Sequence, residues 1–265
     1  MDAIAEFKEK QKAAWANFAV LEGATGTAAP HLVRFAGIET GNEVLDVACG
    51  TGVVALTAAR LGAKVTGLDL TPELIMRAKE NSALMKADVE WLQGDAEALP
   101  FEDARFDVVV SQFGHMFAPR PEVTIKQMLR VLKPGGTIAF ATWPTETFVG
   151  RLFALIGEYA PPLPSGVSPP AQWGDVGIIR ERLGGAVKEL FFAREAMLIQ
   201  TLSAQHYRLF MERSLGPLIK LLKGLDEKEP AKGNELRRRI EQLAAPYHAN
   251  NTLRQDFLLT RAVKT

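Results

Sequence analysis

The sequence lacks the features that would indicate disulfide bonds, a metal site or a membrane-spanning helix. Its 265 residues include a single cysteine, Cys49, which excludes an intrachain disulfide and any metal site built from several thiolates. No run of eighteen apolar residues occurs, so we expect no transmembrane helix. No metal-ligand spacing such as H-x-x-x-H is present either, and we therefore expect no metal site.

An excess of charge of one sign is also missing. The 31 basic and 31 acidic side chains cancel to a formal net charge of zero, so nothing attracts nucleic acid over a long range. The first residues carry interspersed lysines and lack the apolar segment of a signal peptide. We therefore expect a cytoplasmic protein that acts on a small molecule. The sequence leaves open whether it is a monomer or a homodimer.

The pattern of the first half predicts an α/β fold. An apolar fraction of 47% suits a soluble domain with a substantial core. Apolar runs that predict strands alternate with amphipathic stretches that predict helices, the strands falling at residues 43–47, 64–68, 88–93, 106–111 and 137–142. Such alternation indicates a doubly wound, mostly parallel sheet with helices on both faces. Ligands of these sheets bind beyond the carboxyl ends of the strands.

The most informative segment is residues 44–56, which reads as a buried strand, a glycine turn and the start of a helix. Gly50 and Gly52 let the backbone pass close under a ligand, and the helix start directs unpaired N–H groups into the turn. The spacing fits a dinucleotide site, with Asp69 placed to take ribose hydroxyls. Asp46, however, adds a carboxylate where a pyrophosphate would bring negative charge. A ligand with a cationic group, such as S-adenosylmethionine (SAM), suits the turn better.

Further motifs follow in order: GLDLT at 67–71, GDAEALPF at 94–101, FDVVVS at 106–111 and LKPGG at 132–136, after DVACGTG at 46–52. Together they resemble the class I SAM-dependent methyltransferases, within the broad group that includes the ubiquinone and menaquinone biosynthesis enzymes. The motifs cover about residues 41–143. The resemblance implies a seven-stranded, Rossmann-like sheet whose antiparallel last strand, at 252–263, inserts between the fifth strand and a sixth at 187–196.

The resemblance also implies the residues that hold SAM. Those expected at its methionine end are Asp46 and the backbone of Ala48, Gly50 and Gly52, although Ala48 replaces a commoner glycine. Those expected at the nucleoside are Asp69 on the ribose, Leu70 and Ala96 beside the adenine, and Asp95 on the adenine amino group. Those expected near the methyl group are Ser111 and Gln112. Trp15 either closes over the cofactor from an N-terminal helix or packs on the sheet.

We expect one methyltransferase domain over residues 1–265. Residues 1–40 form N-terminal helices, 41–145 the SAM-binding core, and 146–265 the acceptor lid and pocket with the sixth and seventh strands. Phe148, Phe153 and Phe210, among the apolar residues of this last part, predict an acceptor that is at least partly apolar. The same residues suit a plain core equally well.

The sequence contains no obvious catalytic constellation, and methyl transfer needs little more than alignment in a desolvated site. A base is required only when the nucleophile must lose a proton. His115 is the candidate base, because it follows the fourth strand near the expected methyl group; the alternative is a histidine that only lines the pocket or faces solvent. Tyr159 and Tyr207 either line the pocket or pack elsewhere, and Cys49 is expected to pack.

The prediction is therefore a SAM-dependent methyltransferase with a small-molecule acceptor, releasing S-adenosylhomocysteine (SAH). Two alternatives remain from other classes: a SAM-binding protein without transferase activity, and an NAD-dependent oxidoreductase. A nucleic-acid methyltransferase is disfavoured, because SQFG at 111–114 differs from the Asn/Asp-Pro-Pro-Tyr/Phe run of amino-methylating DNA enzymes. The acceptor atom, whether oxygen, nitrogen, carbon or sulfur, stays open.

Overall fold

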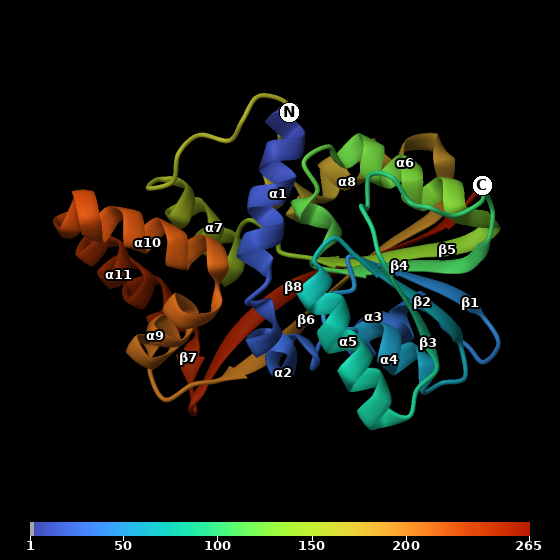
Figure 1. Ribbon diagram of the computed structural model, residues 1–265, viewed down its shortest axis with the longest axis horizontal. Coiled ribbons are helices and arrows are strands. Elements are labelled where there is room, and N and C mark those ends of the chain that lie inside the picture. The colour runs from blue at the N-terminus through green and yellow to red at the C-terminus, as the bar shows by residue number, and fades with distance from the viewer. Residues whose placement is uncertain (1–2) are drawn as a thin grey trace.

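The computed structural model describes residues 3–265, which form one sheet with helices on both of its faces (Figure 1). The strand order is β3-β2-β1-β4-β5-β8-β6. The strands are β1 (Glu43–Val47), β2 (Lys64–Asp69), β3 (Val89–Gln93), β4 (Phe106–Gln112), β5 (Leu132–Thr142), β6 (Val187–Gln200), β7 (His248–Ala249) and β8 (Thr252–Lys264). β1 to β5 are parallel neighbours, while β8 runs antiparallel between β5 and β6.

This order confirms the predicted sheet and the inserted last strand. The sheet has one strand more than expected, because the short β7 pairs with the beginning of β8. The five parallel strands begin or end within a few residues of their predicted limits. The main difference is β5, whose pairing starts at Leu132 and so includes the LKPGG motif, with a shift in register opposite β4.

The helices form two groups: one covers the two faces of the sheet, and the other lies beyond one of its ends. α3 (Ala29–Ala36), α4 (Val53–Ala59) and α5 (Pro72–Met85) lie on one side of the sheet, and α6 (Pro121–Val131) and α8 (Val176–Leu183) lie on the other (Figure 1). α7 (Phe148–Gly157), α9 (Ala204–Ser214), α10 (Gly216–Lys228) and α11 (Pro230–Ala244) pack together beyond one end of the sheet. α1 (Ala3–Trp15) and the short α2 (Glu22–Thr25) lie between the two groups.

The predicted helical stretch at 203–222 is broken in two. α9 ends at Ser214 and α10 begins at Gly216, with Pro217 in its first turn. Proline has no N–H to donate and clashes with the preceding turn, so a continuous helix through this point is disfavoured. The break folds α10 back beside α9 and α11, and this helical group borders the cavity described below.

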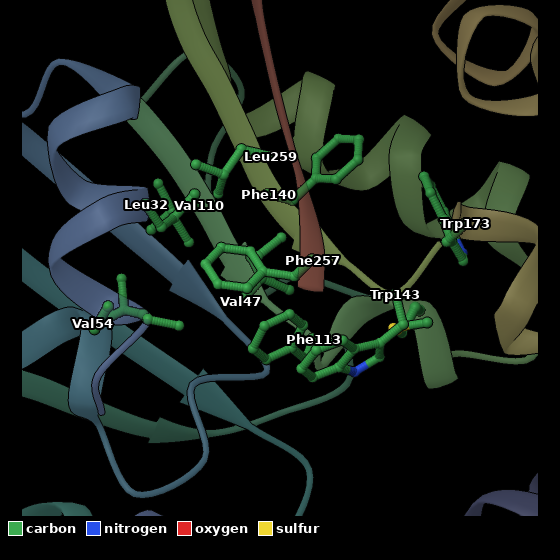
Figure 2. Packing of buried hydrophobic residues seen from close by; sticks show 14 of the residues in the cluster. Leu32, Val47, Val54, Val110, Phe113, Phe140, Trp143, Trp173, Phe257 and Leu259 are labelled. Carbon is green, nitrogen blue, oxygen red and sulfur yellow. The ribbon is translucent and has the colours of Figure 1, made fainter. Parts of the chain in front are cut away.

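The core is continuous across the sheet. β1, β4 and β5 carry near-unbroken apolar runs because both of their faces are covered. Figure 2 shows Val47 and Val110 from neighbouring strands packing with Leu32 on one face, while Phe140 approaches Trp173 on the other. Burying each such side chain contributes about 1.5–3 kcal/mol, which fixes the strand ends that carry the site. None of the helices in residues 3–265 is long and apolar enough to cross a bilayer.

Candidate active site

A cavity lies at the carboxyl ends of the parallel strands, where the sequence predicted a ligand. The predicted cofactor residues that line it are Trp15, Asp46, Ala48, Gly50, Asp69, Leu70, Asp95, Ala96 and Gln112. Two others, Gly52 and Ser111, lie outside its lining, as does His115. The cavity continues from the turns after β1 to β4 into a second region bordered by α1, α7, α9, β6 and β8.

The turn after β1 follows a left-handed course. Ala48 and Gly50 have φ of +55° and +56°, and the Gly50 N–H donates to Oδ2 of Asp69 at 2.8 Å. A Cβ built on Gly50 would meet no other atom within 4 Å, because this position borders the open cavity. The turn therefore leaves a backbone cradle next to Asp46, which a ligand can approach closely.

Gly52 shapes this turn from outside the cavity. A Cβ at this position would lie 2.4 Å from the ring of Trp91 on β3, and the Gly52 N–H donates to the carbonyl of Cys49 at 2.9 Å. Gly52 therefore has a packing role in the turn, because the missing side chain makes room for Trp91 beneath it.

Two buried acceptors at adjacent strand ends have unused oxygens. Oδ2 of Asp46 accepts from the Ala55 N–H at 3.1 Å, while Oδ1 has no partner within residues 3–265. Gln112 donates from Nε2 to the Thr25 carbonyl at 2.9 Å, and its Oε1 is likewise buried with no partner in the described chain. Unsatisfied buried acceptors cost about 1–3 kcal/mol each. A donor-rich cation such as an ammonium group would satisfy both.

Burial, together with the nearby charge of Asp69, raises the pKa of Asp46 to about 8 against the lowering effect of the Ala55 N–H. The carboxyl therefore favours its protonated form until a cation reaches Oδ1. Burial also raises the pKa of the Cys49 thiol well above its ordinary value, with the Asp46 and Asp69 charges adding to the effect. Cys49 stays protonated in the turn, which matches its expected packing role.

Asp69 holds the turns after β1 and β2 together. Its Oδ1 accepts from the Thr71 N–H at 2.8 Å, while Oδ2 accepts from Gly50. Thr71 is the residue before α5, and its hydroxyl accepts no hydrogen bond from the helix. Asp69 instead holds the Thr71 backbone just ahead of the helix. It lines the cavity, and each carboxylate oxygen keeps a second lone pair for a ribose hydroxyl.

Asp95 is engaged by the N-terminal helix. Nζ of Lys8 lies 2.6 Å from Oδ2 of Asp95 and 2.6 Å from Oε2 of Glu97, whose side chain is 1% exposed. Arg120 pairs with the same Glu97 carboxylate. Lys8 thus anchors α1 over the turn after β3, and Oδ1 of Asp95 accepts from the Glu97 N–H. Trp15, at the other end of α1, lines the cavity and lies 4.7 Å from the Phe117 ring.

Ser111 and His115 belong to the core beneath the cavity. Oγ of Ser111 donates to the Val47 carbonyl at 2.6 Å and accepts from the His115 N–H at 3.1 Å. The His115 ring is fully buried beside Phe140 and Trp173, and neither ring nitrogen has a partner among residues 3–265. Burial lowers its pKa to about 3, with the Arg182 charge adding to the effect. The role of general base finds no support in this geometry.

The second region of the cavity is aromatic and aliphatic. Phe113, held at φ +60° after β4, stacks on Trp143 with ring centroids 3.9 Å apart, and both meet the edge of Phe257 (Figure 2). Phe153, Phe210, Met211 and Leu215 complete this wall. In the described chain, the charged residues that line the cavity are Lys8, Asp46, Asp69 and Asp95. The second region is therefore uncharged.

The β6–β8 pair extends this wall beyond the rest of the sheet. Thr142, the final residue of β5, pairs with Leu258, whereas Gln255 pairs with Met197 of β6. Three residues at about 3.3 Å each carry Gln255 roughly 10 Å past the end of β5. Tyr207 of α9 meets it there, with Nε2 of Gln255 donating to the tyrosine hydroxyl at 3.0 Å.

Sequence reasoning left Gln255 out of the site and treated Tyr207 as undecided. The available signal was a glutamine among the alternating apolar residues Leu253, Phe257 and Leu259. Phe148 and Tyr159, the other aromatic candidates of the lid, lie outside the cavity lining: Phe148 is fully buried, and the Tyr159 hydroxyl meets Arg239. Within residues 3–265, no group of three or more His, Cys, Asp or Glu residues is arranged to hold a metal ion.

Comparison with known proteins indicates the family of the chain. A family model described as a methyltransferase domain matches residues 45–140, which contain the turns after β1 to β4. An uncharacterized protein of Mycobacterium tuberculosis is 36% identical over 236 residues, 89% of this chain and 86% of its own length. A demethylmenaquinone methyltransferase of Staphylococcus aureus is 38% identical over 133 residues, 48% of this chain and 54% of its own.

Among solved structures, a phosphoethanolamine N-methyltransferase of Haemonchus contortus in complex with SAM shares the fold. Its TM-score is 0.55 at 18% identity, over 90% of this chain and 52% of that one. The family model thus covers the part of the chain that carries the cofactor motifs. The aromatic region of the cavity lies mostly outside it.

Proposed function

Since the chain belongs to the class I SAM-dependent methyltransferases and SAM is therefore its cofactor, we propose that it transfers a methyl group to a small, largely apolar acceptor. The observation that carries the proposal is the unpartnered Oδ1 of buried Asp46 in a cavity that continues into an uncharged aromatic region. The first feature suits the cationic end of the cofactor, and the second suits a neutral acceptor.

The cofactor end of the cavity fits the groups of SAM. Asp46 and Gln112 would accept from the α-ammonium group, and the backbone cradle at Ala48 and Gly50 would lie along the methionine chain. Asp69 would accept from the ribose hydroxyls. Asp95 keeps acceptor capacity for the adenine amino group beside Lys8.

When bound, SAM supplies an electrophilic methyl group on a sulfonium. The chain's contribution is to align an acceptor with it and to keep water away. Trp15, Phe117 and Phe153 would cover the acceptor from α1, the loop after β4 and α7. The aromatic faces suit the positive charge that is shared between sulfur, carbon and acceptor during an in-line displacement.

None of the described residues in the aromatic region is a base that titrates near neutrality. We therefore infer that the acceptor atom either carries no proton that must be lost or ionises without help from the protein. A neutral amine, a thioether, an acidic thiol or an acidic phenol meets this condition; an aliphatic alcohol does not.

The proposal is tested by titration calorimetry followed by a methylation assay. We expect SAH to bind and NADH to give no heat of binding. In the methylation assay, SAH should form faster with neutral aromatic amines or thiophenols than with matched carboxylates. Tight NADH binding without SAH binding would favour an oxidoreductase. SAH binding with no turnover on any acceptor would favour a SAM-binding protein without transferase activity, and salt-sensitive RNA or DNA binding would favour a nucleic-acid enzyme.

A further inference from the structure

A buried polar pair sits in the otherwise apolar wall of the acceptor region. Tyr207 is 1% exposed and Gln255 is 6% exposed. Leu253 and Phe257, the neighbours of Gln255 on the same face of β8, are fully buried. Phenylalanine and leucine in place of the pair would continue this wall, and replacing a buried polar pair by apolar groups of similar shape is often neutral or stabilising. We therefore expect the fold to tolerate the loss of the pair.

The pair keeps unused hydrogen-bonding capacity. Its one mutual bond takes a single N–H of Gln255 and a lone pair of the Tyr207 oxygen. The Tyr207 O–H, the second N–H of Gln255 and the amide oxygen are left to serve a ligand. Both residues line the cavity. Burial raises the pKa of the Tyr207 phenol, which therefore stays a neutral donor.

The position of the pair is fixed by the sheet. β8 lies two strand spacings from β4, or about 10 Å, and Gln255 lies four residues, about 13 Å, along β8 from the position level with Gln112. The two backbones are thus about 16 Å apart, so an acceptor that meets Tyr207 at one end carries its reacting atom away from the pair, toward Gln112 on the cofactor side.

We propose that Tyr207 and Gln255 select acceptors that carry an uncharged oxygen, a hydroxyl or a carbonyl, at the end away from the methylated atom. A carboxylate or phosphate at that end is rejected, because no cationic side chain among residues 3–265 lines this region to offset its desolvation. This inference rests on the proposed function, since it assigns the far end of the same acceptor.

The test measures binding of three matched probes, naphthalene, 2-naphthol and 2-naphthoate, by calorimetry or tryptophan fluorescence in the presence of SAH. The wild-type protein should bind 2-naphthol about five- to tenfold more tightly than naphthalene, as expected for one or two net hydrogen bonds, and 2-naphthoate most weakly. Tyr207→Phe should abolish the preference for 2-naphthol and leave the affinity for naphthalene unchanged within twofold. Tyr159→Phe, a tyrosine outside the cavity, should keep the preference.

The double variant Tyr207→Phe with Gln255→Leu separates selection from a structural role. It should lose the preference for 2-naphthol while its melting temperature stays within about 3 °C of the wild type. The inference is overturned if 2-naphthol gains nothing over naphthalene, if 2-naphthoate binds best, if Tyr207→Phe keeps the preference, or if no probe binds. Failure of SAH to bind would refute the proposed function, while the preference among the probes remains measurable on the cofactor-free protein.

Discussion

We predict that cofactor binding releases a proton from Asp46. Its pKa of about 8 in the cofactor-free protein means that roughly nine in ten of these carboxyls carry a proton at pH 7. An ammonium group can pair with Oδ1 only when that proton has left. Binding of SAH at pH 7 should therefore release close to one proton per ligand, and the affinity should rise with pH up to about pH 8.

Asp46→Asn removes both the charge and the titration while keeping an oxygen that can accept from the Ala55 N–H. We expect this variant to release no proton and to bind SAH about 10- to 150-fold more weakly, because a hydrogen bond to a charged group contributes about 1.5–3 kcal/mol. Its stability should also respond differently to pH. The raised pKa means that the contribution of Asp46 to stability falls as pH rises from about 4 to 8, by at most about 1.4 kcal/mol per pH unit; the asparagine variant lacks this contribution.

The assay is calorimetry of SAH binding in two buffers of different ionisation enthalpy, from which the number of released protons follows. Asp107→Asn is the matched control, since Asp107 pairs with Lys133 outside the cavity and should leave the proton count unchanged. Proton release near zero in the wild type, or undiminished release in Asp46→Asn, would refute the reasoning.

Three further substitutions give separate tests. Trp15→Ala should weaken SAH binding about fivefold, because the ring lines the cavity and would contact the ligand, with little change in melting temperature; a large drop in melting temperature at unchanged affinity would instead indicate a packing role. His115→Leu should keep turnover within twofold. The pKa of His115 in the folded protein is about 3, below the ordinary 6.5. Wild-type protein should therefore lose more stability than the leucine variant as pH falls from 6.5, which melting curves at pH 7 and 5 would show. Ala48→Gly should raise the melting temperature by about 2–4 °C, because φ +55° costs alanine about 1 kcal/mol. A melting temperature below that of the wild type would contradict the assigned strain.

The cofactor half was predictable from the sequence because its residues are local. Each of Asp46, Asp69 and Asp95 follows a strand with a clear apolar pattern, and parallel strands bring their carboxyl ends to one edge. The sequence could not predict which carboxylate oxygens already accept hydrogen bonds from other parts of the protein. The bonds of Asp69 to Gly50 and of Asp95 to Lys8 depend on the folded positions of segments far apart in the chain.

The failure at His115 has a similar cause. Its place after β4 was predicted correctly, but the direction of its side chain depends on Trp173, which lies more than fifty residues later. The acceptor region was least predictable, because Tyr207 and Gln255 meet only through the insertion of β8 and the break between α9 and α10. Pro217 marks the helix break locally, but no local pattern predicts that the break brings Tyr207 to Gln255.

The insertion of β8 also sets the order in which parts of the sheet can form during synthesis. In the described chain β6 pairs with β8 alone, so until the ribosome has delivered residues 252–264 the sheet stops at β5 and β6 has no neighbour. The turns that we propose to hold the cofactor need only β1 to β4, and they can therefore form before that point. We expect a nascent chain to form the proposed methyl-donor site first, and the proposed acceptor surface only when β8 inserts between β5 and β6.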